Sequence, residues 1–245
     1  MTGTTPRGVT GEQAAAQWVR EMFGRVAGRY DLLNHLLSFN LDKRWRSQLA
    51  ARVAPVLTQP GARALDLCCG TGDVLIALAG QPAAVFGADF SHPMLVAARH
   101  KINARGLPSP VLEADALMLP FGDASLDLVT IAFGFRNFVN YRRGLDELLR
   151  ILKPGGTAAI LEFSQPTGRV FGSLYGFFSR FVLPRVGGLI SGSPDAYSYL
   201  PESIGKFPGA EELAAQMREA GFAEVEFGRM TGGAVALHIG WKAKR

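Results

Sequence analysis

The stretch Arg63-Ala-Leu-Asp-Leu-Cys-Cys-Gly-Thr-Gly-Asp73 decides the fold that we predict for this chain. Its short apolar run ends in two glycines and a polar cluster, after which apolar residues recur with helical spacing. This pattern is typical of a strand, a tight turn and the start of a helix. Gly70 and Gly72 have no Cβ, so the backbone can take positive φ there and a ligand can approach closely. We expect Thr71 to cap the following helix and Asp73 to lie at the positive end of its dipole.

The glycine turn by itself is compatible with several ligands. The dinucleotide-binding fingerprint needs a third glycine, and Leu75 stands where that glycine would be. The sequence also lacks a Gly-x-x-x-x-Gly-Lys-Ser/Thr motif, which argues against a P-loop. In an open α/β sheet such a turn lies at the carboxyl edge of the strands, where ligands bind. The ligand-binding groups are therefore expected at the ends of the neighbouring strands.

Composition limits the class of protein. Hydrophobic residues make up 48% of the 245 positions, which is enough for a large core. The net charge of +5 is mildly basic and suits an anionic cofactor, anionic lipid or nucleic acid without selecting one of them. The two cysteines, Cys68 and Cys69, are adjacent, so we expect neither a disulfide framework nor a metal site. Since there is no apolar signal segment and no apolar run of about 18 residues, we expect a cytoplasmic protein that does not span the membrane.

The region before the first strand is predicted to be helical. We expect Met1–Gly11 to be a disordered tail and residues 12–57 to form an N-terminal helical cap, with helices over Glu12–Val26 and Asp42–Leu57. The intervening Gly28–Asp42 mixes aromatic, charged and apolar residues, and it suits either a cap on the sheet or a lid over the ligand site. Such a lid would contribute Tyr30, Asp31, Asn34 and His35.

Four further apolar runs follow the glycine turn and alternate with helical segments, which predicts a doubly wound, mostly parallel sheet. Two of these predicted strands end in a carboxylate. Asp89 can accept hydrogen bonds from both hydroxyls of an adenosine ribose, or it can cap the next helix, although Ser91 also suits that cap. Asp115, with the backbone N–H of Ala116, can reach an adenine edge. The four runs are Ala83–Asp89, Pro110–Asp115, Leu126–Phe133 and Thr157–Phe163.

The rest of the chain departs from this alternation. A helix from Gly144 is expected to stop at Lys153-Pro-Gly-Gly156. Residues 165–206 follow the last parallel strand, and within them Val170–Leu183 is apolar, aromatic and only weakly periodic. That stretch suits either a buried helix or a surface that meets an apolar ligand or the bilayer interface. The chain is then expected to close with a helix over Ala210–Ala220 and a β-hairpin at the edge of the sheet.

A glycine turn without the third glycine, acids that end two strands and a terminal hairpin together resemble the class I S-adenosylmethionine-dependent methyltransferases. The resemblance implies an α/β, Rossmann-like, seven-stranded and mostly parallel sheet whose last strand is antiparallel. It implies one domain over residues 1–245, with the core at 58–164, an inserted helical substrate lid at 165–206 and the C-terminal helix and hairpin at 207–245. By the same resemblance, the methionine part of S-adenosylmethionine faces Asp66 and the turn of Gly70, Thr71 and Gly72, the ribose faces Asp89, and the adenine faces Asp115 and Ala116.

Several motifs narrow the resemblance to the C-methyltransferases of ubiquinone and menaquinone biosynthesis. It runs from about Trp18 to Lys242. It implies methyl transfer to a ring carbon of a polyprenylated quinol, with a demethylmenaquinol as the favoured acceptor and a benzoquinol as the alternative. Ala132 stands where some members carry a serine thought to touch the cofactor. The motifs are Tyr30-Asp-Leu-Leu-Asn34, Cys69-Gly-Thr-Gly-Asp73, Phe133-Gly-Phe-Arg-Asn137, Leu152-Lys-Pro-Gly-Gly156, Leu161-Glu-Phe-Ser164, Tyr199-Leu-Pro-Glu-Ser-Ile204 and Gly232-Gly-Ala-Val-Ala-Leu-His238.

This activity needs a site that holds the ring carbon in line with the sulfonium methyl and removes a hydroquinone proton through a base or a water relay. Arg136 directly follows the fourth predicted strand, so we expect it to stabilise a developing phenolate or to orient a water, although it also suits an exposed loop. We expect the quinol oxygens to be bound by Asn137, Tyr30, Tyr199 and Glu202, whereas His35 and His238 suit structural roles.

The expected partners follow from this activity. The apolar stretch and the neighbouring Arg180 and Arg185 suit a peripheral contact with the membrane that holds the quinol. A homodimer remains open. We expect no nucleic acid partner, because the Asn/Asp-Pro-Pro-Tyr/Phe motif that methylates exocyclic amines is absent. A nicotinamide dehydrogenase or a binding module that has lost catalysis are the remaining alternatives.

Overall fold

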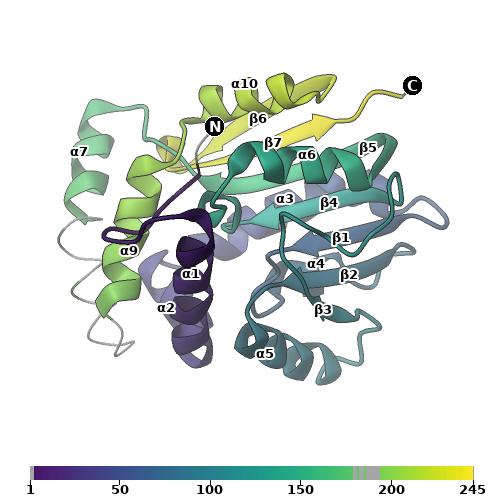
Figure 1. The fold of residues 1–245 in the computed structure, drawn as a ribbon, viewed down its shortest axis with the longest axis horizontal. Coiled ribbons are helices and arrows are strands. Elements are labelled where there is room, and N and C mark those ends of the chain that lie inside the picture. Colours follow the sequence, from purple (N-terminus) through teal and green to yellow (C-terminus); the bar gives the residue numbers. More distant parts are fainter. Residues whose placement is uncertain (1–2, 179–180, 182–184, 186–193, 245) are drawn as a thin grey trace.

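The computed structural model describes residues 3–178, 181, 185 and 194–244. Seven strands of this part of the chain form one sheet in the order β3-β2-β1-β4-β5-β7-β6 (Figure 1). The neighbouring pairs among β1 to β5 are parallel, and β7 runs antiparallel to both β5 and β6. This confirms the predicted class I fold. The strands are β1 (Arg63–Leu67), β2 (Ala84–Asp89), β3 (Val111–Glu113), β4 (Leu126–Ala132), β5 (Leu152–Phe163), β6 (Glu224–Met230) and β7 (Val235–Trp241).

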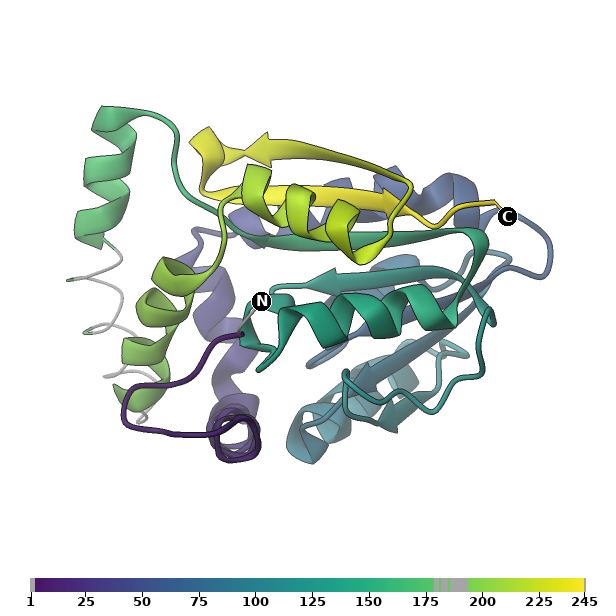
Figure 2. The same ribbon diagram turned by 45° about the horizontal axis from the view of Figure 1, so that its top comes forward.

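Helices cover both faces of the sheet because the central strands are apolar on both sides. On one face α6 (Tyr141–Ile151) and α10 (Ala210–Ala220) pack against the strands, and they lie in front of the sheet in Figure 2. On the other face a second core is formed by α3 (Leu41–Leu57), α4 (Asp73–Leu78) and α5 (His92–Asn103). The sheet is thus the middle layer of three.

A third apolar cluster lies beyond the carboxyl ends of the strands. It joins α1 (Glu12–Val26), α2 (Tyr30–Leu37) and α9 (Pro194–Lys206) through Val19, Leu33 and Tyr199. With α7 (Arg169–Phe177), these helices occupy one end of the molecule, on the left of Figure 1. Short 3₁₀ turns at Ala27–Arg29, Phe135–Asn137 and Thr231–Gly233 connect the elements.

The prediction of a disordered N-terminal tail is wrong for residues 3–5, which dock on the rest of the chain. The backbone N–H groups of Gly3 and Thr4 donate to the carbonyls of Val139 and Phe138 at 3.1 and 3.0 Å. The buried Thr4 hydroxyl also bonds to the Tyr141 hydroxyl. A polar segment is therefore ordered by long-range hydrogen bonds, which its composition did not reveal.

The boundaries around Lys153–Gly156 also differ from the prediction. The helix begins earlier, at Tyr141, and ends at Ile151, after which β5 starts at once at Leu152. The Pro-Gly-Gly segment lies within β5 as an irregularity, since Leu126 pairs with Leu152 but Leu128 pairs with Thr157. Gly155 takes a φ of 76° there. The breaker residues thus interrupt the pairing rather than separate the helix from the strand.

Among the described residues, no helix is long and apolar enough to cross a membrane.

Candidate functional site

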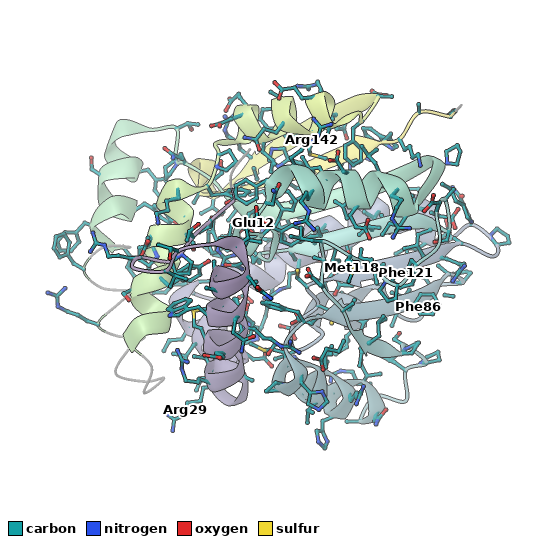
Figure 3. The ribbon with its side chains drawn as sticks, viewed as in Figure 1. Glu12, Arg29, Phe86, Met118, Phe121 and Arg142 are labelled. Carbon is teal, nitrogen blue, oxygen red and sulfur yellow. The ribbon has the colours of Figure 1, made fainter. Side chains whose placement is uncertain are left out.

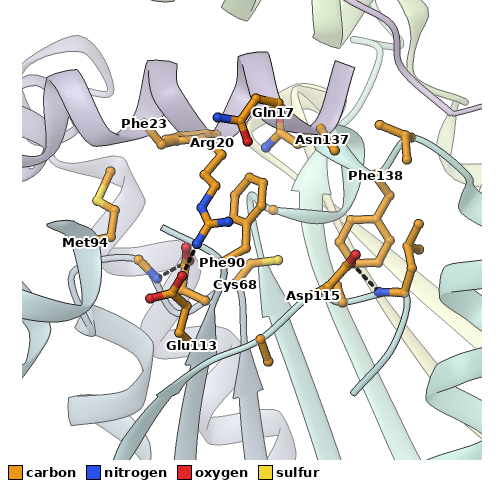
Figure 4. A pocket seen from close by; sticks show the side chains of 18 of the residues that line it. Gln17, Arg20, Phe23, Cys68, Phe90, Met94, Glu113, Asp115, Asn137 and Phe138 are labelled. Atoms are coloured by element: carbon orange, nitrogen blue, oxygen red, sulfur yellow. Dashed lines mark hydrogen bonds and ion pairs between the residues drawn. The ribbon is translucent and has the colours of Figure 1, made fainter. Parts of the chain in front are cut away.

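A large cavity lies at the carboxyl edge of the sheet. It measures about 700 Å³ and is lined by the ends of β1, β2, β3 and β4 and by the inner side of α1 (Figure 4). In Figure 4, Gln17, Arg20 and Phe23 of α1 face the cavity opposite the strand ends. A cavity of this size holds a ligand as large as a nucleoside with an amino-acid side chain. Helix α1 therefore forms the roof of the site.

The glycine turn has the geometry that the sequence predicted, except at Thr71. Gly70 and Gly72 have φ values of 54° and 87°, which a residue with a Cβ adopts with difficulty. Gly72 itself is the N-cap of α4, and no side chain caps that helix. The Thr71 hydroxyl instead donates to Asp31 of α2. Thr71 therefore links the turn to the helical cap, and its predicted capping role is wrong.

Asp89 lies at the centre of the cavity wall. Its Oδ2 accepts the N–H of Gly70 at 2.9 Å and its Oδ1 accepts the N–H of Ser91 at 2.8 Å. Ser91 is the N-cap of α5 by position but makes no side-chain cap bond, so the expectation that its hydroxyl would free Asp89 is wrong. Burial raises the pKa of Asp89 to about 6, although these backbone N–H groups oppose the shift. Each oxygen keeps a lone pair for a ligand hydroxyl.

Two further acids, Asp115 and Glu113, line the same cavity. Asp115 Oδ1 accepts the N–H of Leu117 at 2.8 Å, and Ala116 lies next to it on the wall. Glu113 was not predicted, and it forms ion pairs with Arg20 of α1 and with His92. The spacing of two residues between Glu113 and Asp115 is a signal that could have identified it, because alternate residues of an extended segment share a side.

Asp66 is not part of the cavity wall. It is buried in β1, where its Oδ1 accepts the Thr130 hydroxyl at 2.8 Å. Its Oδ2 has no hydrogen-bond partner among the described residues. Burial raises the pKa of Asp66 to about 7 despite the hydrogen bond from Thr130. Of the predicted cofactor-binding side chains, the structure thus places Asp89 and Asp115 on the cavity wall, and Asp66 and Thr71 behind it.

A smaller cavity of about 80 Å³ lies beside the first, between α1, α2, α3 and α9. Phe23, Tyr30 and Phe133 line both cavities, so these three side chains form the partition between them. Burial raises the pKa of Tyr30, and its hydroxyl bonds to Asn34. Tyr30 therefore presents a neutral hydroxyl at the boundary of the two spaces.

Arg136 lines the smaller cavity and is buried, so the alternative of an exposed loop arginine is wrong. Its Nη1 lies 3.1 Å from Glu162 Oε1, and its guanidinium lies over the ring of Phe163, 5.3 Å from the centroid. Burial lowers the pKa of Arg136, but the charge and hydrogen bond of Glu162, together with Tyr30 and Tyr199, outweigh this and raise the pKa overall. Among the described residues, its Nε has no hydrogen-bond partner. The sequence signal for Glu162 was an acid inside the apolar strand β5.

The other predicted substrate residues separate into two groups. The Tyr199 hydroxyl donates to Asn137 Oδ1 at 3.1 Å, which joins the smaller cavity to the wall of the larger one. Glu202 instead lies on α9 as the partner of Lys206, at 2.6 Å, and lines neither cavity. This placement does not support the predicted contact between Glu202 and a quinol.

The two histidines of the prediction have partners that the sequence did not show. His35 Nδ1 lies 2.8 Å from Asp42 Oδ2, and Asp42 also accepts bonds from Ser38 and Arg46. Burial raises the pKa of Asp42, but these neighbours outweigh it and lower the pKa overall. His238 Nε2 bonds to the Ala210 carbonyl at 2.8 Å. Among the described residues, no cluster of His, Cys, Asp or Glu could hold a metal ion.

The larger cavity fits S-adenosylmethionine. A cationic ligand without phosphates needs carboxylates and a close backbone approach rather than a cluster of basic groups. The cavity has three acids, Asp89, Glu113 and Asp115, around the turn at Gly70. Asp66 lies in β1, which leads into that turn, but it stays behind the cavity wall. We therefore assign this cavity to the cofactor.

The sheet order with β7 reversed and the acid-lined cavity at the carboxyl edge define a class I S-adenosylmethionine-dependent methyltransferase. The chain is similar in fold to a methyltransferase of this class from Aquifex aeolicus (TM-score 0.54, 22% identity, 78% of this chain and 88% of the other). It is also similar in fold to the [4+2]-cyclase SpnF (TM-score 0.61, 18% identity, 80% and 81%), so the fold alone does not fix the reaction.

The family is fixed by sequence. The model of the ubiE/COQ5 methyltransferase family matches residues 10–242, and the chain belongs to that family. It is 51% identical to a demethylmenaquinone methyltransferase of Thermus thermophilus, over 89% of this chain and 99% of the relative. It is 43% identical to the enzyme of that name from Deinococcus radiodurans, over 99% of this chain and all of the relative. The protein is thus an S-adenosylmethionine-dependent methyltransferase.

Proposed function

We propose that the protein transfers a methyl group to a ring carbon of a polyprenylated naphthoquinol, converting demethylmenaquinol to menaquinol. The similarity to demethylmenaquinone methyltransferases over nearly the whole chain supports this acceptor. The observation in the structure that carries the proposal is the buried Arg136, which lines the smaller cavity next to the cofactor cavity and whose Nε has no hydrogen-bond partner among the described residues. A buried cationic donor without a partner is costly unless a ligand oxygen completes it.

S-adenosylmethionine, when bound, supplies an electrophilic methyl group on a sulfonium. The ring carbon forms a bond to that methyl carbon, the methyl–sulfur bond breaks with its electron pair left on sulfur, and the ring carbon then loses its proton. Removal of a hydroquinone proton makes the ring carbon more nucleophilic, and a nearby cation favours the resulting phenolate. Arg136 is suited to this role because Glu162 holds its guanidinium in place.

Three neutral groups are placed to orient the ring. Tyr30 is shared by both cavities, and Tyr199 and Asn137 are joined by a hydrogen bond. Burial raises the pKa of Tyr30 and of Tyr199, so both hydroxyls stay protonated. The Tyr199 proton is held by Asn137 Oδ1, so the Tyr199 oxygen is left to accept a hydrogen bond from a quinol hydroxyl.

A competition between acceptors tests the proposal. The purified protein is incubated with methyl-labelled S-adenosylmethionine and equal amounts of a demethylated naphthoquinol and a demethylated benzoquinol, and the products are identified by mass spectrometry. We expect label on a ring carbon of the naphthoquinol in large excess. The oxidised quinones serve as matched controls and should remain unlabelled, because the quinone ring is electron-poor. Preferential labelling of the benzoquinol, or labelling on oxygen, would contradict the proposal.

The proposal includes a place of action in the cell. We propose a cytoplasmic enzyme that contacts the membrane peripherally to reach its prenylated substrate, with no nucleic acid partner. Arg185, one of the two arginines expected at this contact, is exposed and donates to the Phe181 carbonyl. Arg180 lies outside the described residues. Association of two copies into a homodimer stays a prediction, which light scattering can test.

A further inference from the structure

The side chains of helix α2 point in four directions, and each direction has different surroundings. Which residues share a direction follows from the helical period of 3.6 residues. Tyr30, Asn34 and Ser38 line the smaller cavity, and Asp31 and His35 line a separate hollow at the surface. Leu33 lies in the core. The remaining face carries Leu32, Leu36 and Phe39, which are 61%, 48% and 73% exposed. We call these three residues the outward face.

The outward face is more than a scatter of exposed apolar residues. Leu32 and Leu36 lie four positions apart and share one side of α2, and Phe39 follows in the turn after the helix ends at Leu37. Phe39, at its end, has a φ of 54°, a left-handed conformation that is strained for a bulky residue. Backbone strain that holds a phenylalanine in water suggests a function for that side chain.

The outward face contacts the segment that follows β5. The ring of Phe39 lies 5.9 Å from that of Phe178. Phe177 and Phe181 are exposed nearby in the sequence, and their rings are 5.2 Å apart. This is the apolar stretch that the sequence assigned either to a buried helix or to an apolar surface. Through Phe178 this stretch therefore contacts the end of the outward face.

The surface hollow lined by Asp31 and His35 carries charged side chains that indicate the kind of partner. It measures about 580 Å³ and is lined by four cations and by two carboxylates, Asp31 and Asp73. Lys101 pairs with both of these carboxylates, and Arg46 pairs with Asp73 and with Asp42, so the excess positive charge comes from Lys43 and Arg105. Because Asp31 and His35 precede the outward face around the helix, the basic hollow borders the outward face. An apolar strip beside a basic surface is the arrangement that binds anionic bilayers at the interface. The four cations are Lys43, Arg46, Lys101 and Arg105.

We propose that the outward face of α2 inserts into the interface of an anionic bilayer, with the basic hollow over the lipid phosphates. Helix α2 is then the wall between the bilayer on one side and the smaller cavity on the other. A quinol with its tail in the bilayer would pass this wall before its ring reaches Arg136. The inference rests on the proposed function for the identity of that substrate, but not for the binding to lipid.

Vesicle sedimentation tests whether the outward face contributes to membrane binding. The full chain is mixed with vesicles of phosphatidylglycerol and phosphatidylcholine, and the variant replaces Leu32, Leu36 and Phe39 by serine together. We expect the serine variant to bind the vesicles with an affinity at least about tenfold weaker than that of the wild type, measured from the bound fraction at limiting lipid. The reason is that three apolar side chains no longer leave water on binding. The matched control is Met118→Ser, which removes a 77% exposed apolar side chain from the loop after β3 (Figure 3). It should bind as the wild type does.

Charge reversal tests whether the basic hollow contributes to membrane binding. Lys43→Glu with Arg105→Glu should weaken binding to phosphatidylglycerol vesicles, and added salt should reduce the difference from the wild type. Lys244→Glu is the control, because it lies near the C-terminus at the opposite end of the molecule from α2 (Figure 1). Equal binding to pure phosphatidylcholine and to phosphatidylglycerol vesicles would overturn the electrostatic part of the inference.

Turnover separates this inference from the proposed function. The serine variant should methylate a quinol without a prenyl tail at the wild-type rate, yet lose most turnover of the prenylated quinol in vesicles. Unchanged vesicle binding by the variant would overturn the inference, as would loss of self-association in light scattering with lipid binding intact. If the wild type methylated no quinol but bound vesicles through this face, the proposed function would fail and the inference would stand.

Discussion

At the scale of single residues, the ion pair of Arg136 and Glu162 is unusual because two charged side chains are buried in the interior. Both side chains are almost fully buried, and the backbone N–H of Arg136 also donates to Glu162 at 3.1 Å. A buried ion pair contributes little net stability, but removal of one partner leaves an uncompensated charge. The pair is therefore better explained by a functional need for a fixed cation than by a need for stability.

We predict that Arg136→Ala destabilises the protein by about 3–5 kcal/mol, because Glu162 is left buried and charged. It should also abolish quinol turnover. The double variant Arg136→Ala/Glu162→Gln removes the unpaired charge, so it should regain much of the stability, measured by urea unfolding, but none of the turnover. Recovery of turnover in the double variant would show that Arg136 acts only through the fold.

A second residue-scale prediction concerns Asp89 and pH. Its pKa is raised to about 6 in the folded protein, and a positively charged ligand binds best to the carboxylate form. Affinity for S-adenosylmethionine, measured by calorimetry, should therefore be weak at pH 5, rise as the pH passes through about 6, and level off above it. Asp89→Asn should bind weakly without this step. A wild-type affinity that is flat over this range would exclude Asp89 as a charged contact.

At the scale of elements, α5 joins the helical cap to the glycine turn through one side chain. Lys101 Nζ lies 2.8 Å from Asp31 of α2, 2.5 Å from Asp73 of α4 and 3.2 Å from the Thr71 hydroxyl. The three partners come from segments that are about 30 to 70 positions away in sequence. This cluster holds the cofactor turn in register with the helix that also lines the smaller cavity.

We predict that Lys101→Met lowers the free energy of unfolding by only about 1 kcal/mol, because the ion pairs are partly solvated. Its larger effect should be on binding, since the turn at Thr71 loses its tie to α2, and affinity for S-adenosylmethionine should fall several-fold. Arg99→Met is the matched control, an exposed cation on the same helix. A Lys101 variant with unchanged cofactor affinity would mean that the turn is rigid without the cap.

At the scale of the whole molecule, the N-terminal segment ties distant parts of the chain together. Gly3 and Thr4 bond to the loop before α6, and Lys206 of α9 donates to the Thr5 carbonyl at 2.8 Å. The loop residues Phe138 and Val139 also line the cofactor cavity. The segment thus holds α1, which directly follows it, over the cavity.

We predict that Gly3→Ala releases this segment, because a Cβ at this position would lie 2.1 Å from the Phe138 carbonyl oxygen. The loss of two or three hydrogen bonds should cost about 1–3 kcal/mol, measured by thermal unfolding, and should weaken cofactor binding. Gly122→Ala is the control, since a Cβ there meets nothing within 4 Å. Equal melting temperatures for the two variants would show that the segment is docked too weakly to matter.

The sequence by itself determined most of the strands and helices, the mostly parallel character of the sheet and the glycine turn. These follow from apolar periodicity and from glycine and proline, which act on neighbouring residues and are therefore visible in a linear pattern. It also placed acids at strand ends, because parallel strands bring their carboxyl ends to one edge. Asp89 and Asp115 were found in this way.

Only the tertiary structure decided which groups share a site. The Arg136–Glu162 pair, the ion pair of Arg20 with Glu113 beneath α1, and the docking of Gly3 join positions 26 to more than 130 residues apart. The same is true of Thr71, whose expected cap was replaced by a contact with Asp31. Such contacts depend on packing between elements, and no local pattern encodes the partner. The outward face of α2 is visible for the same reason, since only the folded chain shows which of its four faces is left in water.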